Sequence, residues 1–256
     1  MSNTDRVDKT LFEEGHYLGK PADANDLLVQ RRIRILSQFD GFFGDKYDFL
    51  EIGCGNGNTV LPLSKKFLRT YGLEYTHQHE NDFNQLKKDL GVTNSEFVCR
   101  DITAGPFLPE VDRVLSFEVI EHLPTEEAVK NYALSLKDGG LCAISVPNKW
   151  WIFETHGANL PLLPWNRVPF FSWLPTALHE RWALARIYTK KRIHKLLEDS
   201  GFEIIDTHYV MAPMDVIKWK PLQQFLRKWI FNNDTTKVPF KSVSIMVFCR
   251  KKATTI

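Results

Sequence analysis

The chain has 256 residues, of which 43% are hydrophobic and 25% are charged. This composition is that of an ordinary globular protein and excludes a disordered or low-complexity chain, while the length is near the upper end for one domain. The 33 basic side chains nearly balance the 31 acidic ones, and the formal charge of +2 gives no net field that would favour nucleic acid as a partner.

The start of the chain, residues 1–17, is polar and acidic, whereas a secretory signal needs an apolar run after basic residues. No later stretch is long and apolar enough to span a bilayer. We therefore expect a cytoplasmic protein. The four cysteines occur singly and the histidines lack clear ligand spacing, so we expect neither a disulfide framework nor a metal site.

The first predicted element is a helix over 25–39, whose apolar residues recur at helical spacing. From residue 47 to residue 148, short β-rich runs then alternate with helix-like segments, which is the pattern of a parallel sheet with crossover helices. Strands are predicted over 47–52, 70–75, 96–101, 113–117 and 141–146. The helices between them are predicted over 58–69, 77–90 and 125–137.

After residue 148 the chain becomes rich in tryptophan and proline, which indicates an insertion over 149–188 in place of another regular unit. Regular elements then return, with Gly201 ending the first of them as a helix C-cap. They are a helix over 189–200, a strand over 202–210, a helical stretch over 215–231 and a last strand over 242–249.

The strongest local signal lies at residues 49–58, where an apolar strand runs into three glycines at alternate positions, Gly53, Gly55 and Gly57. Glycines let the backbone turn sharply and approach a ligand closely. Nicotinamide and flavin enzymes carry G-x-G-x-x-G at the same place, but the last position of that pattern is Asn58 here. A nicotinamide-dependent oxidoreductase is therefore one alternative interpretation.

An acid two positions before the first glycine, together with the G-x-G-x-G spacing, resembles motif I of the class I S-adenosylmethionine-dependent methyltransferases. In that family the loop accommodates the methionine part of the cofactor, and the acid holds its amino group directly or through water. The resemblance thus implies that S-adenosyl-L-methionine contacts Glu51, Gly53, Cys54, Gly55 and Gly57.

Two further acids follow the next strands. The second strand ends in Glu74 and Tyr75, which places a carboxylate where it can accept hydrogen bonds from both ribose hydroxyls. The third strand is followed by Asp101 and Ile102, at the position where an acid of the family accepts the adenine amino group. This second acid favours the methyltransferase over the oxidoreductase.

The fourth strand continues into FEVIEHLP over 117–124, which resembles the motif IV region of the small-molecule, ubiquinone-biosynthesis-like branch with its E-H-L ending. The resemblance covers about residues 45–148 and the tail strands. It implies that Phe117 and Glu118 touch the cofactor or close the pocket floor. His122 is a candidate catalytic residue, although a histidine at such a turn often only satisfies backbone groups. No Asn-Pro-Pro-Tyr type tetrapeptide follows the strand, which disfavours methylation of nucleobases.

The family resemblance implies an α/β fold, a Rossmann-like three-layer sandwich with a mostly parallel seven-stranded sheet and an antiparallel last strand. We expect a single domain over 1–256, with an aromatic-rich cover insertion. Its predicted parts are an N-terminal cap and helix over 1–44, a cofactor-binding core over 45–148, a substrate cover over 149–188 and a C-terminal completion of the sheet over 189–256. Related enzymes often use an N-terminal lid, which would bring Tyr17 near the sulfonium.

Ligands bind outside the carboxyl ends of parallel strands, so the insertion is placed to cover a methyl acceptor. Its aromatic density favours a small or amphipathic acceptor, lipid-linked or glycan acceptors included, and O-methylation is expected ahead of N- or C-methylation. Transfer from a sulfonium needs mainly alignment, plus proton removal when the acceptor is a hydroxyl. His156 is the first candidate base. The other polar candidates of this segment are Glu154, Asn159, Arg167, His179, Glu180 and Arg181.

The stretch 215–231 has a helical side that carries basic neighbours, so it could lie on the inner face of an anionic membrane. The apolar residues of this side are Trp219, Leu222, Phe225, Leu226, Trp229 and Ile230. The alternative is an ordinary amphipathic helix packed on the core, with Pro221 near its start. For the whole chain, a noncatalytic binding module with the same fold is a further alternative. The sequence does not indicate an oligomeric state.

Overall fold

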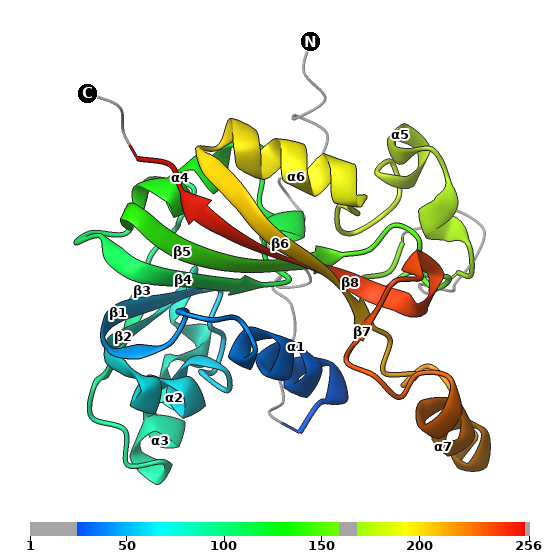
Figure 1. Cartoon of the computed structure of the whole chain (residues 1–256), viewed down its shortest axis with the longest axis horizontal. Helices are drawn as coiled ribbons and strands as arrows, with labels where there is room; N and C mark the ends of the chain where they lie inside the picture. Colours follow the sequence, from blue (N-terminus) through cyan, green and yellow to red (C-terminus); the bar gives the residue numbers. More distant parts are fainter. Residues whose placement is uncertain (1–24, 159–167, 254–256) are drawn as a thin grey trace.

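The computed structural model describes residues 25–158 and 168–253 (Figure 1). Within these residues, eight strands form one sheet in the order β3-β2-β1-β4-β5-β8-β6-β7. The strands are β1 Gly44–Ile52, β2 Phe67–Glu74, β3 Ser95–Cys99, β4 Val111–Phe117, β5 Leu136–Pro147, β6 Phe202–Met211, β7 Thr235–Thr236 and β8 Ser242–Lys251.

The strand directions confirm a mostly parallel sheet. Strands β1 to β5 run parallel to one another, and the order reverses at β1, which lies between β2 and β4. The last strand, β8, is antiparallel to both β5 and β6, as predicted for 242–249. The sheet has one strand more than the predicted seven, because the two-residue β7 pairs with the end of β6 and is too short to show a periodicity.

Helices cover both faces of the sheet and make the three-layer sandwich. In Figure 1, α1, α2 and α3 lie on one side of the sheet, and α4 and α6 lie on the other. Two hydrophobic clusters fill the spaces between the sheet and its helices. Neighbouring residues of β1 alternate between them: Phe49 belongs to one cluster and Leu50 to the other. The helices are α1 Leu27–Ser37, α2 Val60–Leu63, α3 Glu80–Asp89, α4 Val129–Leu134, α5 Thr176–His179, α6 Lys190–Asp199 and α7 Lys220–Trp229.

Three predicted helices are wrong in length. The predicted stretch over 215–231 is helical only in α7, Lys220–Trp229. The predicted helix over 58–69 is only the four residues of α2 and one 3-10 turn, Ser64–Lys66. The strand β2 already begins at Phe67, because this ring is buried and stacks on Phe49 with ring centroids 4.3 Å apart. The predicted helix over 125–137 likewise ends at Leu134, since Leu136 already pairs with β4.

The insertion leaves the sheet and returns to it at one point. Asn148 and Tyr188 form an isolated bridge, and the amide of Tyr188 donates to the carbonyl of Pro147 at 3.0 Å. Trp151 is buried within the insertion, whereas Trp173 is partly exposed. The candidates Asn159 and Arg167 and the predicted lid residue Tyr17 lie outside the described residues.

The amphipathic stretch forms α7, which begins at Lys220 with Pro221 in its first turn and lies at the periphery of the molecule (Figure 1). On its inward side the Gln223 amide donates to two backbone carbonyls, and Leu226 packs against the hydrophobic cluster that contains Trp151. Trp219, Phe225 and Trp229 are 67%, 54% and 65% exposed. The apolar side is thus divided: Leu226 packs on the core, as the alternative predicts, whereas Trp219, Phe225 and Trp229 do not.

Candidate active site

The glycine loop between β1 and α2 takes backbone conformations that require glycine. Gly53, Gly55 and Gly57 have φ angles of 77°, 52° and 84°. A Cβ on Gly53 would overlap the Val119 side chain, and a Cβ on Gly57 would lie 2.6 Å from the Phe83 ring. The loop is thus packed tightly against Val119, which follows β4, and against the Phe83 ring of α3.

Glu51 is a buried acid directly before this loop. Within the part of the chain that the structure describes, its Oε2 atom has no hydrogen-bond partner, and burial raises the pKa of the carboxyl. Cys54, which follows the first glycine, points elsewhere: a Cβ on Gly72 would lie 2.8 Å from its Sγ atom, so the thiol packs on β2. Only Glu51 of these two offers a free polar atom.

The acids after β2 and β3 lie at the same edge of the sheet. Glu74 accepts hydrogen bonds from the amides of Gly55 and Tyr75, both at 2.9 Å, and each oxygen keeps a second lone pair. Asp101 accepts from the amide of Thr103 at 2.8 Å. The neighbouring Ile102 is buried, whereas Tyr75 is exposed.

Glu118 is held by a partner that the sequence did not reveal. Its φ of 56° is left-handed, and its Oε1 atom accepts from the Ser145 hydroxyl at 2.7 Å. The same oxygen lies 2.8 Å from the guanidinium of Arg32, a buried residue of α1 that also sits 5.7 Å over the Phe117 ring. The only sequence signal for this pair is a basic residue inside the amphipathic pattern of 25–39.

The two candidate catalytic histidines meet beside Glu121. Glu121 and His122 belong to the 3-10 turn Ile120–His122, and His156 comes from the insertion. The Nε2 atom of His156 is 3.5 Å from Oε1 of Glu121, and the two imidazoles pack edge to face with centroids 4.8 Å apart. We call these three residues the Glu-His-His cluster; one ligand-type atom from each lies within 4.8 Å of the others.

Glu121 is the buried member of the cluster, and both histidines are partly exposed. Glu121 is 2% exposed, and neither carboxylate oxygen has a hydrogen-bond partner within residues 25–158 and 168–253. Burial and the neighbouring carboxylate of Glu118 raise the pKa of Glu121. Burial and the adjacent His156 lower the pKa of His122 to about 3, which leaves its imidazole neutral at physiological pH.

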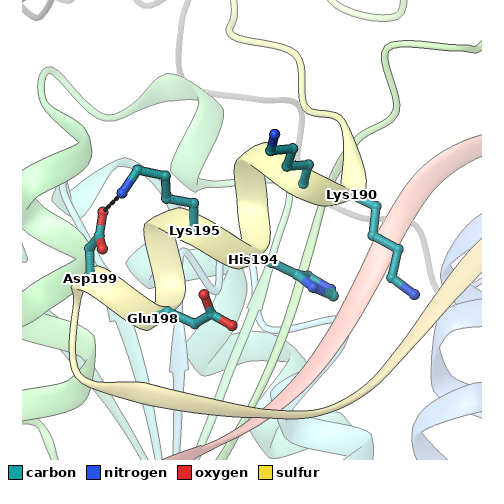
Figure 2. A pocket seen from close by; sticks show the side chains of 6 residues that line it. Lys190, His194, Lys195, Glu198 and Asp199 are labelled. Atoms are coloured by element: carbon teal, nitrogen blue, oxygen red, sulfur yellow. Dashed lines mark hydrogen bonds and ion pairs between the residues drawn. The ribbon is translucent and has the colours of Figure 1, made fainter.

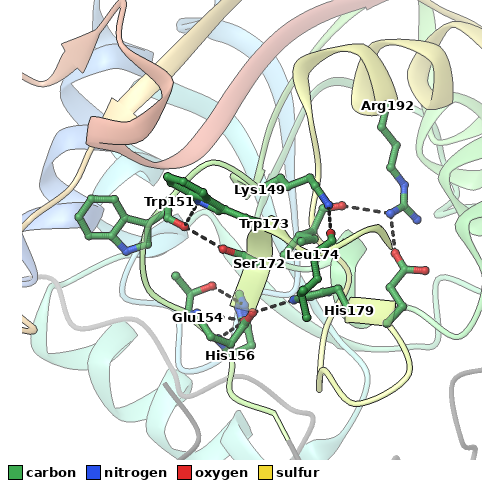
Figure 3. Close-up of polar contacts among 12 residues, drawn as sticks. Lys149, Trp151, Glu154, His156, Ser172, Trp173, Leu174, His179 and Arg192 are labelled. Carbon is green, nitrogen blue, oxygen red and sulfur yellow. Dashed lines mark hydrogen bonds and ion pairs between the residues drawn. The ribbon is translucent and has the colours of Figure 1, made fainter. Parts of the chain in front are cut away.

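A polar core inside the insertion fixes His156 (Figure 3). One oxygen of Glu154 accepts from the amides of Thr155 and His156 at 3.0 and 3.2 Å, and its other oxygen is 2.7 Å from Nε2 of His179. Glu154 and His179 are both fully buried. The Thr155 hydroxyl lies 2.9 Å from Nδ1 of His156, which leaves Nε2 on the side of Glu121.

A second region of polar side chains, the open hollow along α6, has a different character (Figure 2). All its lining residues come from this one helix, and Lys195 forms an ion pair with Asp199 at 2.8 Å, one turn away. Such a surface is a solvated helix face. The candidate active site is therefore the edge of the sheet between the glycine loop and the insertion.

Comparison with known proteins decides the family. A family model described as a methyltransferase domain matches residues 9–207. The chain belongs to the class I S-adenosylmethionine-dependent methyltransferases. The predicted recognition, enzyme class and cofactor are thereby confirmed, and the oxidoreductase and the noncatalytic module lose their support.

Two curated relatives differ in the atom that their names say they methylate. The ubiquinone biosynthesis O-methyltransferase of Rickettsia canadensis is 23% identical, covering 86% of this methyltransferase and 92% of the relative. The (S)-tetrahydroprotoberberine N-methyltransferase of Eschscholzia californica is 32% identical over 95 residues, which is 36% of this chain and 25% of the relative. Both relatives are therefore named as methyltransferases, but their names give different acceptor atoms, oxygen in one and nitrogen in the other.

Solved structures share the fold at low identity. A putative S-adenosylmethionine-dependent methyltransferase of Listeria monocytogenes has a TM-score of 0.60 at 15% identity, covering 89% of this chain and 99% of that one. The N-methyltransferase NodS of Bradyrhizobium japonicum, in complex with S-adenosylhomocysteine, has a TM-score of 0.56 at 13% identity, covering 98% and 100%. These similarities confirm the Rossmann-like methyltransferase architecture.

Proposed function

We propose that this methyltransferase O-methylates a small or amphipathic hydroxylated acceptor, which binds between the glycine loop and the insertion. The observation that carries this proposal is the Glu-His-His cluster, because activation of a hydroxyl needs a group that assists loss of its proton. The cluster begins two residues after Val119, which packs on Gly53 of the loop. The O-methyltransferase relative, matched over most of its length, supports the same choice.

The residues of the sheet edge suit S-adenosylmethionine, which supplies the methyl group on a sulfonium. The unpaired buried oxygen of Glu51 suits the amino group of the methionine part, and Gly53 has no room for a side chain beside the ligand. We assign the ribose hydroxyls to Glu74 and the adenine amino group to Asp101, with Ile102 against the ring. Glu118 and Phe117 close the pocket floor through Arg32 and do not need to touch the cofactor.

Within the cluster, an acceptor would reach the two partly exposed histidines and not the buried Glu121, and we assign the contact to His156 of the insertion. Its side chain keeps 18% of its surface exposed, whereas that of Glu121 has none. As the acceptor oxygen forms its bond to the methyl carbon, the carbon–sulfur bond breaks and the hydroxyl proton leaves. We assign activation of the hydroxyl to the cluster, with His156 as the member that contacts the acceptor.

The cofactor assignment is tested by calorimetric titration with S-adenosylmethionine, S-adenosylhomocysteine and NAD in parallel. We expect binding of both adenosyl ligands, no binding of NAD, and about tenfold weaker adenosyl binding in Asp101→Ala, because one hydrogen bond to the cofactor is lost. Unchanged affinity in Asp101→Ala would remove this residue from the site.

The acceptor class is tested by a methyl-transfer assay with matched pairs of amphipathic compounds that carry a hydroxyl or an amine at the same position. Transfer to the hydroxylated members supports the proposal. Transfer confined to the amines overturns O-methylation and leaves the methyltransferase assignment intact.

We further infer that α7 and its flanks contact an anionic membrane surface. The exposed aromatic residues Trp219, Phe225 and Trp229 can enter the interfacial layer while basic side chains meet the headgroups. The basic residues around them are Lys218, Lys220 and Lys228. Among the described residues, no helix is both long and apolar enough to cross a bilayer. Such a surface would bring an amphipathic acceptor close to the site.

A flotation experiment tests the membrane contact. The protein is expected to float with vesicles containing phosphatidylglycerol, to float less at high salt, and to be lost from the vesicles when Trp219→Ser and Trp229→Ser are combined. The matched control combines Leu68→Ser and Leu134→Ser, two side chains that are each 52% exposed elsewhere on the surface. Equal flotation of both double variants would contradict a role for α7.

A further inference from the structure

The Glu-His-His cluster has the composition of a metal site as well as that of a proton-transfer site. Its three side chains come from two separate parts of the fold, the turn after β4 and the insertion, and present one carboxylate and two imidazoles to one point. Glu121 is buried there without a hydrogen bond to either oxygen among the described residues, an arrangement that is costly unless a positive group completes it. Nδ1 of His122 is buried in the same condition.

We propose that Glu121, His122 and His156 bind one divalent transition-metal ion, zinc foremost, at the edge of the methyl-acceptor pocket. Two imidazoles and one carboxylate form the ligand set of catalytic zinc sites, which keep a further position open for water or substrate. The two nitrogens favour zinc, cobalt or manganese over magnesium, which prefers oxygen ligands. His156 closes the site from its exposed side.

The groups behind His156 suit a metal ligand. A ligating imidazole usually donates its other N–H to a neighbouring acceptor, which fixes the tautomer and the ring. The Thr155 hydroxyl is placed for this role at 2.9 Å from Nδ1, while Glu154 holds the backbone amide of His156. Ligands about 2.1 Å from a tetrahedral ion lie roughly 3.4 Å apart, so the cluster must contract by about 1 Å around the ion.

The chemical consequence rests on the proposed function. An acceptor hydroxyl at the open position of the ion loses its proton to solvent more readily, since the ion lowers the pKa of a bound oxygen acid. The resulting alkoxide or phenolate oxygen forms the bond to the methyl carbon as the carbon–sulfur bond breaks, and the neutral sulfide leaves. In this scheme His156 is a metal ligand through Nε2 and not the base.

Metal binding is measured on the full-length protein after removal of any affinity tag and dialysis against EDTA. We expect one equivalent of Zn²⁺ by calorimetry, and visible absorption bands of a nitrogen- and oxygen-ligated ion when Co²⁺ is used. Glu121→Gln and His156→Ala are each expected to weaken Zn²⁺ binding at least 100-fold. Thr155→Val, which removes only the supporting hydroxyl, is expected to weaken it about tenfold. The control is His77→Ala, an exposed histidine of another surface.

Several outcomes overturn the metal site. One is that the wild-type protein binds no stoichiometric Zn²⁺. Another is that Glu121→Gln and His156→Ala leave the affinity for Zn²⁺ unchanged. Retained S-adenosylmethionine affinity shows that each variant is folded; if Glu121→Gln fails this check, the partly exposed His156 decides alone. Turnover that EDTA leaves intact also contradicts the ion but keeps O-methylation. Conversely, a protein that binds Zn²⁺ yet methylates only amines overturns the proposed function and keeps the site.

Discussion

His156→Ala is expected to lower kcat by about 10²–10⁴-fold while the affinity for S-adenosylmethionine stays within a factor of about two. The reason is that His156 is a partly exposed member of the Glu-His-His cluster and lies on the insertion, whereas the proposed cofactor residues lie at the strand ends of the sheet. Single-turnover methyl transfer to a hydroxylated acceptor measures the loss, and calorimetry measures the cofactor affinity.

His77→Ala is the matched control for this experiment, because His77 is an exposed histidine at the start of the helical segment before α3. Its turnover is expected to equal that of the wild type. Unchanged turnover in His156→Ala would remove His156 from the reaction. A parallel loss of cofactor affinity would instead indicate that the insertion contributes to the cofactor pocket.

Glu118→Gln is expected to lower the free energy of unfolding by about 3 kcal/mol, or roughly 5–10 °C in Tm, because the buried guanidinium of Arg32 loses its anion. The amide can still accept the hydrogen bond from Ser145, so the loss reports mainly on the charge. Urea unfolding followed by circular dichroism measures the change.

The control for this second experiment is Glu203→Gln, whose carboxylate is exposed and lies 4.0 Å from Arg250. A surface pair of this kind is expected to contribute less than about 1 kcal/mol. Combining Arg32→Met with Glu118→Gln should recover part of the loss, since no unpaired buried charge remains. Equal stability of Glu118→Gln and wild type would show that Arg32 is satisfied without Glu118.

The glycine loop and the positions of the main strands could be predicted because both depend on local patterns, whereas the arrangement of the sheet was implied only by the family resemblance. The loop has glycines at alternate positions, and each of these strands is an apolar run bounded by a turn. Helix ends were less predictable. The helical spacing of apolar residues over 58–69 continues past Lys66, but Phe67 already pairs with β1 and belongs to the sheet. Tertiary pairing overrode helical spacing there.

The site was predictable in its parts and not in its arrangement. His122 and His156 were each identified as candidates, but ligand spacing considers residues close in sequence, and the insertion brings His156 to Glu121 only in the folded chain. Arg32 was missed because a pattern analysis treats a basic residue on an amphipathic helix as solvated. The apolar side of α7 was ambiguous for a related reason, since periodicity is the same whether that side is buried or exposed.

The two ends of the insertion are hydrogen-bonded to each other, with the amide of Lys149 donating to Tyr188 and that of Tyr188 donating to Pro147. The strand before it and the helix after it would therefore stay in place if the intervening segment were exchanged for one of another length. Such a junction lets acceptor preference diverge during evolution while the nucleoside-binding half stays unchanged. The exchange would also remove His156, so a new acceptor specificity would have to bring its own means of activating the acceptor.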